Sequence, residues 1–129
     1  MEGAVPLWTG TASRTQARAV RDKLTDPAEF ATTVPFPTVS KSSLYFSPTA
    51  YWRGPVWFDQ AYFALGGLRR YGYDKDANAL TEQLLTRASG LTGNGSIMEN
   101  YDPMTGAPLN SPNFSWSAAL LLPMLTRDN

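Results

Sequence analysis

A single glutamate, Glu99, stands in the segment GSIMENYDPMTGAP, residues 95–108, just before a Tyr-Asp-Pro sequence that favours a turn. Met98 and Tyr101 offer it partly apolar surroundings, and Asn100 offers a positioning amide. A fixed carboxylate of this kind suits a general base that activates water, and hydrolysis of a glycosidic bond uses two carboxylates. The alternative is structural, because most loop glutamates only accept hydrogen bonds from nearby amides or from an arginine. For Glu99 considered alone, the structural interpretation is favoured.

A second candidate is the segment YWRGPVW, residues 51–57, which combines three aromatic residues, one arginine and a Gly-Pro bend. In a sugar site, Tyr51, Trp52 and Trp57 would stack on the apolar face of a pyranose. Arg53 would then bind hydroxyls or hold a catalytic carboxylate in place. The structural interpretation has the aromatic residues filling the core and Arg53 pairing with an acid. Composition alone favours the structural interpretation.

The remaining chemical candidates are weaker. Asp59 stands near the start of an expected helix, where it complements the helix dipole, so a structural role is predicted. The string GLTGNG lacks the lysine of a phosphate-binding loop and is expected to be a turn. The spacing of an EF-hand loop is absent. The sequence leaves open whether scattered Asp and Asn oxygens bind a calcium ion. We predict no cofactor and no metal site.

Composition limits the chemistry and the partners. Eleven basic and eleven acidic residues cancel, so no basic surface is expected for nucleic acid or an anionic membrane. The chain has no cysteine and no histidine, which leaves acid–base chemistry to carboxylates. The longest apolar run, residues 118–122, is too short to cross a bilayer, and the start MEGAVPLW carries no targeting pattern. No compartment is assigned.

The elements that would position these residues are expected to be helices. Periodicity and capping signals predict them over residues 13–24, 57–72, 75–89 and 115–126, with Pro123 kinking the last one. The second and fourth are apolar on most sides and are expected to be buried, whereas the third is amphipathic. Residues 31–50 carry three prolines and predict a long ordered loop. Alternating buried and amphipathic helices indicate two helical layers, so the predicted class is all-α in a single domain without a sequence repeat.

Several motifs, taken in order, resemble glycoside hydrolase family 63: YWRGPVW, FDQAYFALGGLRRYGY, DANAL, GSIMENYDPMTGAP and SPNFSWSAALLL. The likeness is to the carboxy-terminal part of bacterial α-glucosidases, which are relatives of the glucosidases that trim mannosyl-oligosaccharides. The resemblance implies a barrel of six inner and six outer helices. It also implies inverting hydrolysis of α-glucosidic bonds in oligosaccharides by two carboxylates. The family's general base lies in a Glu-Asn-Tyr motif, so this role falls to Glu99.

The resemblance also implies a sugar pocket. Its predicted residues are Tyr51, Trp52, Arg53, Trp57, Tyr101 and Trp116. The family's general acid is an aspartate in an upstream motif, and nothing in residues 1–50 resembles that motif. Four helices also fall short of twelve. Residues 1–129 are therefore expected to be the carboxy-terminal portion of a catalytic barrel, inactive alone, with the remainder of the barrel or further copies of the chain as partners.

Two other functions stay open at this point. One is a non-catalytic carbohydrate-binding or interaction module that keeps the aromatic residues. The other is a trehalase-like hydrolase, which shares the glutamate motif but fits YWRGPVW less well.

Overall fold

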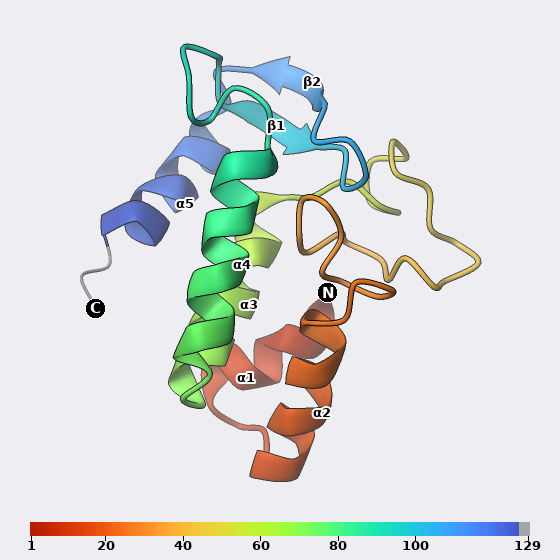
Figure 1. The fold of residues 1–129 in the computed structure, drawn as a ribbon, viewed down its shortest axis with the longest axis vertical. Coiled ribbons are helices and arrows are strands. Elements are labelled where there is room, and N and C mark those ends of the chain that lie inside the picture. The colour runs from red at the N-terminus through yellow and green to blue at the C-terminus, as the bar shows by residue number, and fades with distance from the viewer. Residues whose placement is uncertain (127–129) are drawn as a thin grey trace.

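The computed structural model describes residues 1–126 and shows a mainly helical chain with one small sheet (Figure 1). A short 3₁₀ helix, Glu2–Ala4, leads directly into the first α-helix. The elements that follow are α1 (Val5–Thr9), α2 (Arg14–Leu24), α3 (Phe58–Arg70), α4 (Asp74–Arg87), β1 (Met98–Tyr101), β2 (Pro108–Pro112) and α5 (Ser115–Thr126). None of the described helices is long and apolar enough to cross a membrane.

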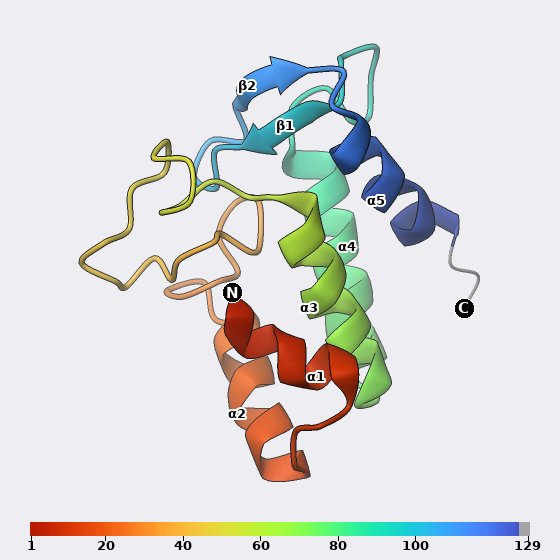
Figure 2. The same ribbon diagram turned by 180° about the vertical axis from the view of Figure 1, so that it is seen from behind.

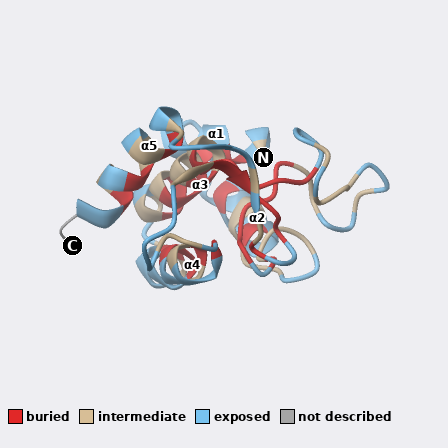
Figure 3. Ribbon diagram, turned by 90° about the horizontal axis from the view of Figure 1, so that it is seen from above, coloured by how far each residue is buried: buried red, intermediate tan, exposed pale blue. Residues whose placement is uncertain are grey.

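Helix α3 forms the centre of the core, with α1, α4 and α5 packed against it (Figures 1 and 2). Its buried residues include Ala61, Ala64 and Leu68, and Figure 3 shows α3 with buried and intermediate positions between the neighbouring helices. Gly67 lets α1 approach closely, because a Cβ atom there would lie 2.7 Å from the Cβ atom of Leu7. The sheet lies at one end of the α3–α4 hairpin, and α1 and α2 lie at the other end.

The helix predictions for residues 13–24, 57–72, 75–89 and 115–126 are confirmed to within two residues at each end. The capping box that predicted the start of α2 is present: the Ser13 amide donates to Gln16 Oε1, and the Gln16 amide donates to Ser13 Oγ. Asp59 lies in the first turn of α3, where its charge complements the helix dipole as expected.

The all-α class is wrong for the part of the chain that carries Glu99. The Glu-Asn-Tyr motif is not in a loop but forms β1, which pairs with β2 in antiparallel orientation. The turns predicted between them are present, because Asp102 Oδ1 accepts the amides of Met104 at 2.7 Å and Thr105 at 3.1 Å. These turns reverse the chain and so bring β2 alongside β1.

Helix α5 is less buried than its sequence predicts. It packs against α3 and β1 with one face, on which Leu121 and Met124 are buried. Leu122 is 62% exposed and Leu125 is 57% exposed on the other face. The expectation of a largely buried helix is therefore wrong for this chain, and the helix continues through Pro123 to Thr126.

The segment from residue 31 to residue 50 is a long loop without helix or strand, as expected, and it extends to one side of the molecule (Figures 1 and 2). Phe36 is fully buried and anchors its first half. Glu29 anchors the next part, because its carboxylate accepts the hydroxyls of Ser40 and Ser42 and the Lys23 ammonium group. These contacts fix the base of the loop, which then leads into residues 51–57.

Candidate functional site

Glu99 lies on β1 and is 8% exposed. Two backbone hydrogen bonds join this strand to the segment before α3: Val56 N–H donates to Tyr101 O at 2.8 Å, and Tyr101 N–H donates to Val56 O at 3.1 Å. Helix α5 holds the strand from another side, because Ser117 Oγ donates to the backbone oxygen of Glu99 at 3.1 Å. Strand β1 is thus fixed by both neighbouring segments, and Glu99 with it.

The Glu99 carboxylate is bound through both of its oxygens. The Tyr51 hydroxyl donates to Oε1, and the Ser111 amide donates to Oε2 at 3.4 Å. A carboxylate offers about four acceptor positions, so about two remain for water or substrate. The pKa of Tyr51 is raised, first by its hydrogen bond to Glu99, then by burial and by the carboxylate charge. Tyr51 therefore stays protonated and donates to Glu99.

Four aromatic residues, Tyr51, Trp52, Trp57 and Trp116, form an aromatic cluster next to this carboxylate. Trp52 and Trp57 are stacked, with ring centroids 4.2 Å apart and planes 7° apart. Tyr51 lies edge-on to both rings, and Trp116 lies 5.9 Å from Trp57. Trp57 is 3% exposed, whereas Trp52 and Trp116 are each 48% exposed. The cluster thus has a buried base and accessible aromatic surface, which suits stacking on a sugar.

The backbone of residues 51–54, the YWRG loop, is held in an unusual conformation. Tyr51 has a φ of 40°, a left-handed value that costs a non-glycine residue about 1–3 kcal/mol. Its carbonyl accepts the Trp57 indole N–H at 3.0 Å, which helps to hold this conformation. Gly54 lies directly against Ser47, where an added Cβ atom would be 2.1 Å from the backbone oxygen. Strain of this kind clusters at functional sites, and here it directs the Tyr51 hydroxyl toward Glu99.

Two predicted site residues have other surroundings than expected. Arg53 is exposed, and its guanidinium makes no hydrogen bond or ion pair within residues 1–126, so it does not hold Glu99. Tyr101 is fully buried, stacks on Phe58 at 5.4 Å and accepts the Met98 amide through its hydroxyl oxygen. Burial raises the pKa of Tyr101. Its place in the core fits support of β1 and not direct contact with a sugar.

The structure adds contacts that the sequence did not reveal. Ser111 and Ser117 both bind Glu99, one through its amide and the other through its hydroxyl. Ser117 belongs to the SPNFSWSAALLL motif, but its spacing from Glu99 carries no pattern that indicates contact. Asn100 was expected to position the carboxylate, and its amide instead binds Asn110 on the facing strand.

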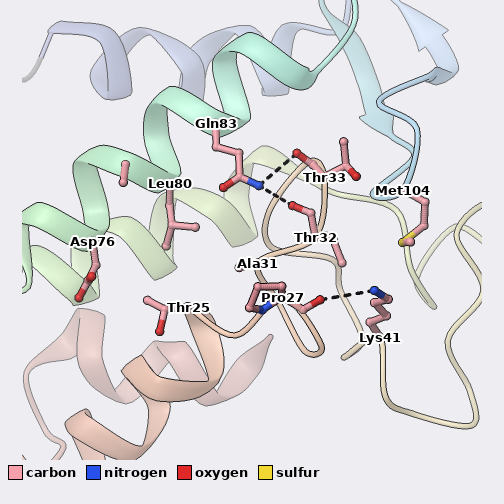
Figure 4. Close-up of a pocket in the computed structure, with 11 residues that line it drawn as sticks. Thr25, Pro27, Ala31, Thr32, Thr33, Lys41, Asp76, Leu80, Gln83 and Met104 are labelled. Carbon is pink, nitrogen blue, oxygen red and sulfur yellow. Dashed lines mark hydrogen bonds between the residues drawn. The ribbon is translucent and has the colours of Figure 1, made fainter.

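A cavity of about 550 Å³ lies between α4 and the start of the long loop (Figure 4). Gln83 Nε2 donates across it to the backbone oxygens of Thr32 at 2.7 Å and Thr33 at 3.3 Å, and Lys41 Nζ donates to Pro27 O at 3.5 Å. None of the predicted site residues lines it. Its polar groups join the loop to the helix, so it is a structural feature separate from the site around Glu99.

Comparison with known proteins identifies a glycoside hydrolase domain. The mannosylglycerate hydrolase MGH1-like glycoside hydrolase domain matches residues 1–117. A mannosylglycerate hydrolase from Rubrobacter radiotolerans is 39% identical over 123 residues, which cover 92% of this chain and 26% of that protein. A glucosylglycerate hydrolase from Mycolicibacterium hassiacum is 39% identical over 89 residues, which cover 69% of this chain and 19% of that protein.

The solved structures show the same relationship. A family 63 mannosylglycerate hydrolase from Thermus thermophilus, in complex with Tris and D-glycerate, superposes with a TM-score of 0.80 at 34% identity. The match covers 95% of this chain and 28% of that chain, so this chain spans only a small part of its relatives. The resemblance to family 63 is confirmed, but the expected likeness to bacterial α-glucosidases is corrected, because these relatives hydrolyse mannosylglycerate or glucosylglycerate. The chain belongs to the MGH1-like glycoside hydrolase family.

Proposed function

We propose that this chain supplies the general base and part of the sugar pocket of a glycoside hydrolase that releases glycerate from an α-glycosylglycerate by inversion. The main observation in support is that the Tyr51 hydroxyl fixes the Glu99 carboxylate beside an accessible aromatic cluster. The names of the relatives support mannosylglycerate or glucosylglycerate as the substrate class. This class replaces the oligosaccharide α-glucosides expected from the sequence.

In the proposed reaction, Glu99 removes a proton from water while the water oxygen attacks the anomeric carbon. The bond to the glycerate oxygen breaks, and a second carboxyl group protonates that oxygen. Inversion places the two carboxyl groups about 6.5–9.5 Å apart, so that water fits between base and sugar. Tyr51 occupies one position on Oε1 and Ser111 one on Oε2, which leaves acceptor positions for the attacking water.

The exposed rings of Trp52 and Trp116 are the proposed stacking surfaces for the sugar. Glycerate differs from a sugar aglycone because it carries a carboxylate, which requires a cationic or amide partner. Arg53 is an exposed cation without a partner in the described chain, and it follows Trp52 directly. We assign Arg53 to the glycerate carboxylate.

Residues 1–129 form, in this proposal, the carboxy-terminal portion of a larger helical barrel. The general acid then comes from residues outside this chain, since no motif within it resembles the one that carries the acid. General acid assistance contributes about 10²–10⁴-fold, so the chain alone is expected to bind a sugar weakly without hydrolysing it. A carbohydrate-binding module without catalysis is the second candidate, favoured by the same exposed tryptophans.

The test uses the complete protein that contains this segment, with mannosylglycerate and glucosylglycerate as substrates. Glu99→Gln keeps the shape of the side chain but cannot accept a proton, so kcat should fall about 10²-fold or more while KM changes little. Glu82→Gln, on the exposed face of α4, is the matched control and should be silent. NMR of the first-formed anomer should show inversion. Near-normal turnover of the Glu99 variant would exclude the base role, and absence of turnover in the parent would favour the binding module.

A further inference from the structure

The β1–β2 pairing is irregular at Glu99. Met98 pairs with Pro112 and Asn100 pairs with Leu109, so one residue lies between the paired positions on β1 and two residues lie between them on β2. The extra residue lies in the pair Asn110–Ser111, opposite Glu99. A bulge of this kind turns the local backbone and re-aims the groups beside it. At this bulge, the Ser111 N–H points toward Glu99 Oε2 and donates to it.

The bulge has an identifiable cause at Asn110. This residue has a φ of 59°, a left-handed conformation that asparagine tolerates better than most residues. Its side-chain Nδ2 donates to Asn100 Oδ1 at 2.8 Å. Asn100 is fully buried, and its own Nδ2 has no hydrogen-bond partner among the described residues. Asn110 therefore provides the contact that orients the Asn100 amide, and Asn100 in turn holds the bulge.

We propose that the Asn100–Asn110 pair is a positioning device for the general base, which locks the bulge so that the Ser111 amide fixes the free side of the Glu99 carboxylate. This inference rests on the proposed role of Glu99. Tyr51 holds Oε1 from the loop before α3, and Ser111 holds Oε2 from the hairpin. Two donors on different oxygens restrict rotation of the carboxylate, which a single donor would permit.

The geometry makes this contact sensitive to the bulge. At 3.4 Å the Ser111–Glu99 bond is longer than the usual range of about 2.7–3.2 Å, so it is close to the distance at which a hydrogen bond is lost. A small shift of β2 would break it. Misplacement of a reacting group by about 1 Å costs about 10²-fold in rate, so control of this one strand position matters for a base that must face its water.

The experiment uses the complete protein that contains this segment and needs no substrate. The amide proton of Ser111 is followed by NMR as the pH is lowered through the range in which carboxyl groups bind protons. The chemical shift of a hydrogen-bonded amide proton changes with the charge of its acceptor. The Ser111 signal should therefore move as the pH is lowered, and Glu99→Gln should abolish this movement. Asn110→Ala removes the side-chain donor and disfavours the left-handed backbone. Asn110→Gly removes the donor but tolerates that backbone.

Both Asn110 variants should reduce the pH-dependent shift of Ser111 by about twofold or more, because the bond is already near its limit. Asn113 is the matched control: it has a φ of 55° in the next turn, and its alanine and glycine variants should retain the full response. Asn110 is exposed, and unchanged dispersion of the other amide signals will show that each variant folds.

Three results would overturn the inference. The first is a Ser111 signal that does not respond to Glu99 in the parent chain. The second is an Asn110→Ala variant that responds like the parent. The third is a full response in Asn110→Gly, which would show that the pair with Asn100 contributes nothing. None of these depends on hydrolysis, so a failure of the base role in the complete enzyme is a separate result.

Discussion

Gly54 in the YWRG loop is a position where the addition of one methyl group should disturb the site. A Cβ atom there would lie 2.1 Å from Ser47 O, 2.6 Å from Ser47 C and 3.0 Å from Pro48 Cα. All three are backbone atoms, so no side chain can rotate away. The same turn contains two hydrogen bonds, Ser47 N–H to Arg53 O at 2.7 Å and Gly54 N–H to Thr38 Oγ1 at 2.9 Å. Gly54→Ala must open this turn.

The cost follows from these contacts. Overpacking of a closed site costs about 1–3 kcal/mol. Loss of one of the two hydrogen bonds in this turn adds about 1 kcal/mol. The free energy of unfolding should therefore fall by about 2–4 kcal/mol. With a slope near 2 kcal/mol per molar urea, the denaturation midpoint should fall by about 1–2 M. The near-UV circular dichroism of the stacked Trp52–Trp57 pair should weaken as the loop moves.

Gly93→Ala is the matched control, because nothing lies within 4 Å of an added Cβ atom there. It should change the free energy of unfolding by less than about 0.5 kcal/mol, as surface substitutions usually do. The reasoning is refuted if Gly54→Ala unfolds at the same urea concentration as Gly93→Ala with an unchanged aromatic spectrum, since the loop would then have to accept a methyl group where backbone atoms stand.

Other expected outcomes concern the loop anchor, the substrate and the exposed helix face. The pKa of Glu29 is lowered to about 2, mainly by its hydrogen bond from Lys23. Because this value lies below the ordinary 4.5, the stabilisation is present above about pH 4.5 and is lost as the pH falls toward 2. Glu29→Gln should therefore destabilise the chain at neutral pH and match the parent near pH 2 in urea titrations; a constant difference would contradict the pairing. In the complete enzyme, Arg53→Gln should weaken binding of glycerate by about tenfold and leave glucose binding unchanged, measured by calorimetry, because a charge-assisted hydrogen bond contributes about 1.5–3 kcal/mol. The isolated chain should self-associate through the exposed apolar face of α5, and the double variant Leu122→Lys, Leu125→Lys should reduce the apparent mass in light scattering; a parent chain that stays monomeric at high concentration would contradict this.

The helices were predictable because their signals are local. The capping box of α2 specifies its start within four residues, Ser13 to Gln16, and the apolar spacing of α3 and α4 repeats over three or more turns. The short helix α1 was missed, since its five residues give no period and Pro6 resembles a loop signal. In the structure Pro6 stands at the first turn of that helix, where proline is tolerated.

The strands could not be predicted from their own residues. MENY shows no alternation of apolar and polar residues, and PLNSP contains two prolines. They form strands because the Asp102 turn brings them side by side and because β1 also pairs with Val56. Burial of α5 was overestimated for a related reason: composition shows that a helix is apolar but does not show which neighbours cover it.

The candidate site was predicted residue by residue but not as an arrangement. Glu99 and the aromatic residues of YWRGPVW were singled out by type and by resemblance to a family. Their direct contact could not be anticipated, because Tyr51 and Glu99 are 48 positions apart and the bond depends on a left-handed backbone at Tyr51. The same holds for the Asn100–Asn110 pair, which only the register of the two strands brings together.

The bridge between Val56 and Tyr101 also has a consequence for how this segment tolerates change in length. The chain leaves the site at Val56, runs through α3 and α4, and returns to the site at Tyr101. Two hydrogen bonds between Val56 and Tyr101 join the two ends of this segment. Residues 92–96, an exposed part of the turn after α4, belong to this segment. Insertions there would lengthen the segment without moving its two ends. Homologues that differ in this turn should therefore retain the spacing between aromatic loop and glutamate, and a reporter peptide inserted there should leave the site intact.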